Sequence, residues 1–75
     1  MSKDYDEGYL IGISHGYDSA NFADAYGGSV GSADERLTDR TVSDAYRSGY
    51  VTGWDEGIER FENDQWPDGS PRDED

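Results

Sequence analysis

Apolar side chains recur every three or four residues in two separate parts of the chain. In the first part the recurring positions lie between residues 5 and 20, and in the second between residues 42 and 61. This spacing places the apolar side chains along one face of an α-helix. The pattern predicts one helix over about 3–17, extending at most to 26, and a second over about 41–63.

The segments outside these helices have a different composition. Residues 27–38 are rich in Gly and Ser at their start and predict a flexible linker. Within it Leu37 is expected to pack across the joint between the helices. Residues 64–75 combine two prolines with many acidic residues and predict a disordered acidic tail. Small polar residues that can cap a helix stand near each predicted start: Ser2 or Asp4 for the first helix, Thr38 or Thr41 for the second.

The two predicted helices are copies of one pattern. Shifting the chain by 41 residues aligns "YDEGYLIGISHG" at 5–16 with "YRSGYVTGWDEG" at 46–57. Two copies are too few for a solenoid. A duplicated helix predicts an all-α helical hairpin with antiparallel helices, and its thin core favours pairing of two chains into a dimeric four-helix bundle.

Each copy carries three glycines at four-residue spacing, although a glycine inside a helix costs roughly 0.8–1 kcal/mol relative to alanine. On a helical wheel the glycines lie beside the aromatic residues, so another helix could approach closely over them. We expect these positions to form a helix-packing surface; the alternative is an exposed aromatic groove for a partner's helix. The positions are Tyr5, Gly8, Tyr9, Gly12, Gly16, Tyr46, Gly49, Tyr50, Gly53, Trp54 and Gly57.

The net charge changes the picture of what the chain can bind. Its 75 residues include 18 acidic and 6 basic ones, a net charge of −12. This balance argues against direct binding to nucleic acid or to anionic lipid and favours a basic protein as partner. Adaptation to high salt, or the codon usage of a GC-rich genome, would give a similar composition.

The sequence contains no cysteine and no pattern typical of a signal peptide or a membrane span. We therefore expect a cytoplasmic protein without disulfides that does not bind membranes.

Side chains suited to catalysis or metal binding are few. Residues 64–75 resemble a calcium loop, but Trp66 stands at a ligand position and the final bidentate Glu is missing. His15 is the only histidine and is expected on a helix surface, and phosphate-binding glycine motifs are absent. We expect no enzyme activity, no cofactor and no metal. For Trp66 three alternatives stand: it folds back onto the helices, stays exposed without a role, or anchors a short acidic-aromatic binding motif.

The motif "YxxGYxxG", present in both repeats, resembles that of short acidic orphan proteins of bacteriophages, particularly those of high-GC actinobacterial hosts. The likeness covers the two repeats only. It implies an accessory protein of phage type, acting in the host cytoplasm by binding and blocking a host protein. The resemblance brings no active-site residue with it.

Two functions are compatible with these features. In the first, the chain is an inhibitor whose carboxylates imitate the phosphates of nucleic acid and occupy a basic cleft of a host defence or DNA-binding protein. The residues expected to supply this charge are Asp6, Glu7, Asp55, Glu56, Glu59 and Glu62. In the second, the chain is a structural or assembly adaptor that docks through the Gly/aromatic helix face.

Overall fold

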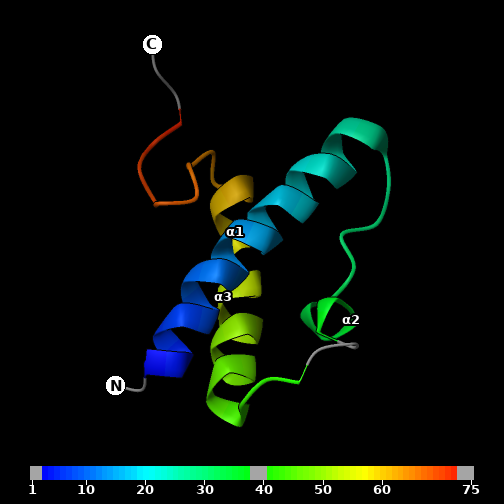
Figure 1. Cartoon of the computed structure of the whole chain (residues 1–75). Helices are drawn as coiled ribbons and strands as arrows, with labels where there is room; N and C mark the ends of the chain where they lie inside the picture. The colour runs from blue at the N-terminus through cyan, green and yellow to red at the C-terminus, as the bar shows by residue number, and fades with distance from the viewer. Residues whose placement is uncertain (1–2, 38–40, 73–75) are drawn as a thin grey trace.

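Two long helices packed against each other form the body of the protein. The computed structural model describes residues 3–37 and 41–72. In this part α1 spans Lys3–Tyr26, the short α2 spans Ala33–Arg36 and α3 spans Asp44–Glu62. The helices α1 and α3 cross each other and pack together over most of the length of α3 (Figure 1). The short α2 contacts α3. The predicted all-α pair of Gly/Tyr-repeat helices is confirmed.

The helices α1 and α3 run in the same direction, whereas the sequence had suggested antiparallel helices. Gly8 lies against the main chain of Tyr46, and Gly16, two turns later, lies against Trp54. Both helices therefore advance together from the end that holds the N-terminus (Figure 1). Residues 27–43 lead the chain from the end of α1 back to the start of α3, and a connection of this length permits the parallel arrangement.

The contacts between the two helices repeat the internal symmetry of the sequence. Gly8 faces the carbonyl group of Tyr46, and its repeat counterpart Gly49 faces the carbonyl group of Tyr5. The same exchange recurs one and two turns later along the helices. The two repeats are thus related by an approximate two-fold axis parallel to the helices, as in an isologous dimer.

The six repeat glycines allow the main chains of α1 and α3 to lie close together. A Cβ atom at any of them would overlap with a carbonyl oxygen of the opposing helix, so the glycine hydrogen in that direction points at the oxygen. Cα–H···O contacts of this kind contribute about 0.5–1 kcal/mol each. Their sum is comparable with the helix-propensity cost of the glycines, roughly 0.8–1 kcal/mol each. The close contact therefore offsets the cost that the sequence alone left unexplained.

The helix α1 continues through residues 16–19, where weak helix formers left its end uncertain. Gly16, Tyr17 and Ala20 are buried along α1, so tertiary packing outweighs the low helix propensity of this stretch. The helix ends where Gly27 adopts a positive φ of 78° and donates its N–H to the carbonyl oxygen of Ala23 at 2.7 Å. A left-handed glycine is a frequent helix terminator.

The predicted flexible linker contains the ordered helix α2. Ser32 and Glu35 form a reciprocal capping box: the Glu35 N–H donates to Ser32 Oγ at 3.4 Å, and the Ser32 N–H donates to Glu35 Oε1 at 3.2 Å. The cap positions Ala33 and Leu37 in one buried cluster with Tyr50 and Trp54. The expected packing of Leu37 across the joint is confirmed.

The helix α3 is capped by Ser43 instead of either predicted threonine. The Tyr46 N–H donates to Ser43 Oγ at 3.1 Å, and this hydroxyl donates to Asp4 Oδ2 at 3.0 Å. Thr41 lies two residues before the cap. Of the other predicted caps, Asp4 lies inside the first turn of α1, while Ser2 and Thr38 lie outside the described residues.

Replacing Ser43 by alanine is expected to lower the free energy of unfolding by about 1 kcal/mol, because the N-cap acceptor of α3 is lost. The midpoint of thermal unfolding, followed by circular dichroism, should fall by roughly 4–8 °C. The matched control is Ser48→Ala at an exposed position inside α3, where alanine favours the helix. Equal melting of both variants would contradict the capping role.

Residues 64–72 form a folded segment, here called the C-terminal turn, where the sequence predicts the start of a disordered tail. The Arg72 N–H donates to the carbonyl oxygen of Asp64 at 2.8 Å and closes the turn. The Arg72 guanidinium donates to Tyr17 Oη at 3.0 Å and lies 5.0 Å from the centre of the Phe61 ring. These contacts attach the turn to both long helices. Residues 73–75 of the predicted tail lie outside the described residues.

Candidate protein-binding surface

The glycine and aromatic positions predicted as one surface fall into three environments. The six glycines lie buried between α1 and α3. Tyr50 and Trp54 are also buried, with exposed fractions of 2% and 3%, beneath Ala33 and Leu37. The remaining aromatic positions, Tyr5, Tyr9 and Tyr46, are half-buried. The glycine face is therefore occupied within the chain, and of these predicted positions only Tyr5, Tyr9 and Tyr46 are partly accessible.

His15 contributes to the packing between the helices, whereas the sequence placed it on a helix surface. Its Nδ1 lies 2.7 Å from Tyr50 Oη, and its ring meets the Tyr50 ring edge-on with 5.6 Å between the centres. The ring is half-buried. The histidine thus satisfies the hydroxyl group of a buried tyrosine. The sequence could not reveal this contact, since the two residues lie 35 positions apart.

The six predicted acidic residues all face outward to some degree, but they do not form one cluster. Five are exposed and Glu56 is half-buried. Since Gly8 lies against Tyr46 and Gly16 against Trp54, Asp6 and Glu7 are level with the first turn of α3. The acidic residues of 55–62 begin roughly 15 Å further along the axis. The structure therefore has an acidic group at each end of the helix pair.

Along α3, three of these carboxylates form one stripe. Asp55, Glu59 and Glu62 stand four and three residues apart, which places them on one face of the helix. Successive charges are separated by roughly 4.5–6 Å of helix axis. A single strand of duplex DNA carries one charge per roughly 3.4 Å. The stripe thus has more than half of the linear charge density of one DNA strand.

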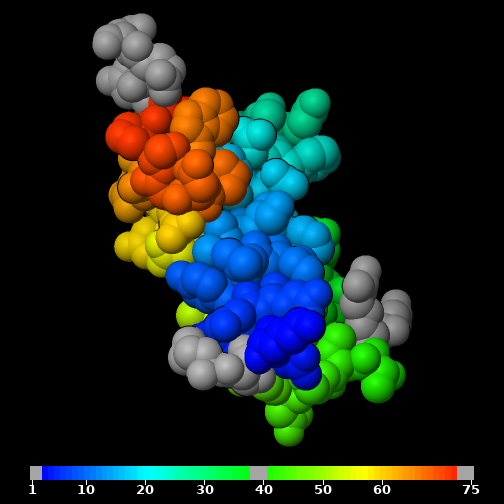
Figure 2. All heavy atoms as spheres, turned by 60° about the vertical axis from the view of Figure 1, so that its left-hand side comes forward, coloured from blue at the N-terminus to red at the C-terminus, as the bar shows by residue number. Residues whose placement is uncertain are grey.

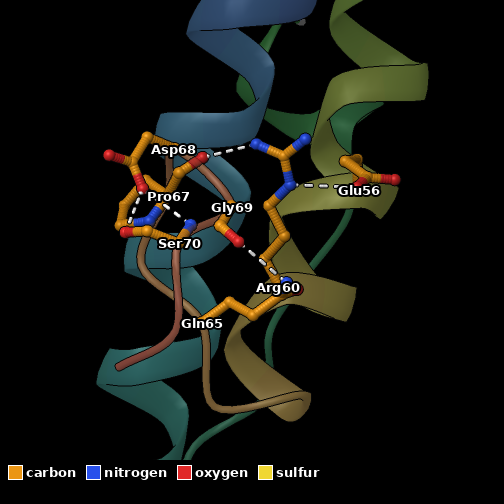
Figure 3. A network of polar contacts seen from close by, with 7 residues as sticks. All are labelled: Glu56, Arg60, Gln65, Pro67, Asp68, Gly69 and Ser70. Carbon is orange, nitrogen blue, oxygen red and sulfur yellow. Dashed lines mark hydrogen bonds and ion pairs between the residues drawn. The ribbon is translucent and has the colours of Figure 1, made fainter. Parts of the chain in front are cut away.

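The fourth acidic residue of this region belongs to a polar network with the C-terminal turn (Figure 3). Arg60 Nε lies 2.9 Å from Glu56 Oε2, while Arg60 Nη1 donates to the carbonyl oxygen of Pro67 at 2.6 Å. Inside the turn, the Gln65 amide donates to the carbonyl oxygen of Gly69 at 2.9 Å. Arg60 is thereby committed to contacts inside the chain, and the network fixes the turn beside α1.

Asp68 stabilises the tip of the C-terminal turn. The Ser70 N–H and hydroxyl group donate to Asp68 Oδ1 at 2.9 Å and 2.7 Å. These two hydrogen bonds hold the pKa of the Asp68 carboxyl below its ordinary value, and the bond from the Ser70 main chain contributes most. The side chain therefore stays negatively charged at neutral pH and adds one exposed carboxylate next to α1.

Trp66 lies in the C-terminal turn and is 45% exposed. The main-chain N–H of Trp66 donates to the carbonyl oxygen of Ser70 at 2.8 Å, so the main chain of Trp66 is fixed within the turn. The segment that carries Trp66 has folded back onto the helices, while a large part of the indole ring remains accessible. The role of Trp66 as an anchor for a partner stays a prediction.

An open groove runs between α1 and the C-terminal turn. It is lined by Tyr9, Leu10, Ile13 and Ser14 of α1, by Arg60 of α3, and by Pro67 and Asp68 of the turn. We call it the α1 groove. In Figure 2 the N-terminal half of α1, in blue, is open to view below the orange residues of the turn. Leu10 is 66% exposed at its edge. The sequence does not distinguish Leu10 from Val51, because the two residues occupy equivalent places in the two repeats.

Within residues 3–37 and 41–72, no group of three or more histidine, cysteine, aspartate or glutamate side chains is arranged to hold a metal ion. Among the described helices, none is long and apolar enough to cross a membrane. Comparison of the chain with family models, with curated proteins and with solved structures finds no match.

Proposed function

We propose that this chain is a non-enzymatic inhibitor that binds a basic region of a host protein, with its carboxylates in place of the phosphates of nucleic acid. The observation that carries the proposal is the net charge of −12 on a chain of 75 residues. A charge excess of this size attracts a basic surface over several ångströms and raises the rate of association. The resemblance to small acidic phage proteins favours a phage-encoded protein that acts in the host cytoplasm.

The placement of the charged side chains supports this function. Asp55, Glu59 and Glu62 project from one stripe of α3, and all three are exposed. Two of the few cations are already paired inside the chain, since Arg60 contacts Glu56 and Arg72 contacts Asp64. The outer surface therefore presents mostly unneutralised carboxylates, which is the electrostatic pattern that a nucleic-acid-binding cleft attracts.

The adaptor function needs a different docking face from the one first expected. The repeat glycines lie between α1 and α3, so a partner has no access to them while the pair is folded. What favours an adaptor is the half-buried aromatic side of α1, with Tyr5 and Tyr9 stacked at 6.4 Å between ring centres. An adaptor would dock there with little dependence on salt.

The salt dependence of partner capture tests the proposal. A tagged chain is incubated with an actinobacterial lysate at about 0.05 M and about 0.5 M salt, with and without duplex DNA, and captured proteins are identified by mass spectrometry. We expect nucleic-acid-binding proteins that are released by high salt and displaced by DNA. The variant with Asp55→Asn, Glu59→Gln and Glu62→Gln should capture several-fold less. Capture that survives high salt and ignores DNA would rule out mimicry.

A further inference from the structure

The approximate two-fold symmetry gives the α1 groove an equivalent on the other side of the molecule. A shift of 41 residues relates Tyr9, Leu10 and Ile13 to Tyr50, Val51 and Trp54. The second set lies beneath α2 and Leu37, and its tyrosine and tryptophan are buried almost completely. In the first set Ile13 is also buried, at 4% exposed, but Tyr9 is only half-buried and Leu10 is 66% exposed, against 36% for Val51. No helix of the described residues packs over Tyr9 and Leu10 as α2 packs over Tyr50.

The covered side shows what kind of segment fits such a face. Ala33 and Leu37 are one helical turn apart, joined by the hydrogen bond from the Leu37 N–H to the Ala33 carbonyl oxygen at 3.2 Å. They place a small and a large apolar side chain on Tyr50 and Trp54. Between them, Arg36 extends over the Trp54 ring at 5.7 Å from its centre. A single helical turn with a small residue, a leucine and a cation is therefore sufficient.

Charges around the α1 groove select a basic occupant. Asp68 lines the groove, and Asp6 lies one turn before Leu10 on α1. Arg60 lines it too, but its charge is matched by Glu56 at 2.9 Å. Lys3, two turns before Leu10, is the only lysine or arginine of α1. A second copy of the chain would bring another net charge of −12 and would be repelled.

We propose that the α1 groove binds a short basic helical segment of a partner protein, which presents a small residue and a leucine one turn apart to Tyr9 and Leu10. The segment occupies this face as α2 occupies the equivalent face. The preference for a basic segment rests on the proposed function, whereas the position of the site rests on the symmetry and on the exposure of Leu10. The groove supplies the specific apolar contact, and the carboxylates supply long-range attraction.

The probe is a short lysine-rich helical peptide with alanine and leucine four positions apart. Its binding to the full chain is followed by fluorescence anisotropy and by amide chemical shifts. We expect the largest shifts at Tyr9, Leu10 and Ile13. Leu10→Asp should weaken binding roughly tenfold or more through loss of the apolar contact. The matched control is Val51→Asp at the equivalent position, which adds the same charge and should leave the affinity within about twofold.

Each other outcome decides against the groove. Equal effects of both variants, with shifts spread over Asp55, Glu59 and Glu62, would overturn it while leaving the acidic function intact. Shifts at Leu10 that grow with protein concentration alone would make the groove an interface between copies. A peptide with serine in place of leucine that binds equally well would also overturn it. By contrast, capture that resists salt in the lysate experiment would contradict the proposed function, while the chemical shifts caused by the peptide would still be expected at the groove.

Discussion

Replacing Gly53 by alanine is expected to destabilise the protein by about 2–4 kcal/mol, although alanine is the better helix former. The added Cβ atom would overlap with the carbonyl oxygen of Tyr9 and lie 2.9 Å from the nitrogen of Ile13. Both atoms belong to the main chain of α1, so no rotation of a side chain relieves the overlap. The helices must separate, and the close contacts above and below weaken with them.

Urea unfolding followed by circular dichroism measures this loss. The control is Thr52→Ala, one position earlier on an exposed side of the same helix, where alanine should stabilise slightly. The repeat-equivalent variant Gly12→Ala meets the carbonyl oxygen of Tyr50 and should lose a similar amount. A Gly53→Ala variant that gains stability, as helix propensity alone predicts, would show that the close contact is absent in solution.

The glycine spacing predicted the contact between the helices but not their direction. Glycines every four residues mark the face of a helix that another helix approaches, whichever way that helix runs. Direction depends on the connection, and the composition of residues 27–38 predicts a flexible linker in which Leu37 alone is expected to pack. The signal for an ordered connection was present, since Ser32 and Glu35 have the spacing of a capping box. The three glycines next to this capping box, Gly27, Gly28 and Gly31, instead favour the prediction of a flexible linker.

The C-terminal turn could not be inferred from local sequence. Its composition is that of a disordered segment, and the contacts that attach it join Arg72 to Tyr17 across 55 positions. Arg60 reaches Pro67 from the preceding helix. Contacts of this kind leave no periodic pattern, so only the folded chain reveals them.

The sequence predicted which acidic residues are accessible, but it could not predict where the α1 groove lies. The acidic residues named from the sequence are exposed or half-buried on the helices, because charged side chains rarely enter a core without partners. The α1 groove could not be found, since Leu10 and Val51 have equal places in the two repeats. What distinguishes them is that α2 packs on one side only, and this follows from the path of the connection.

Replacing Leu37 by alanine is expected to lower the free energy of unfolding by about 2–4 kcal/mol. Leu37 is 2% exposed and belongs to the cluster of Ala33, Tyr50 and Trp54. Its loss removes buried apolar surface and loosens α2, whose single turn has little stability alone. In a Trp66→Phe background the fluorescence of Trp54 reports the exposure of this cluster. The control Leu10→Ala removes the same atoms from a 66% exposed position and should change stability by under about 0.5 kcal/mol.

The same variant connects the fold to the binding proposal. Once α2 is loosened, the face of Tyr50 and Trp54 becomes equivalent to the α1 groove, because the two faces are related by the repeat symmetry. The basic peptide should then occupy a second site, with new amide shifts at Tyr50 and Val51. If Leu37→Ala destabilises the chain no more than Leu10→Ala does, α2 does not cover this face in solution. The comparison of the two faces would then lose its basis.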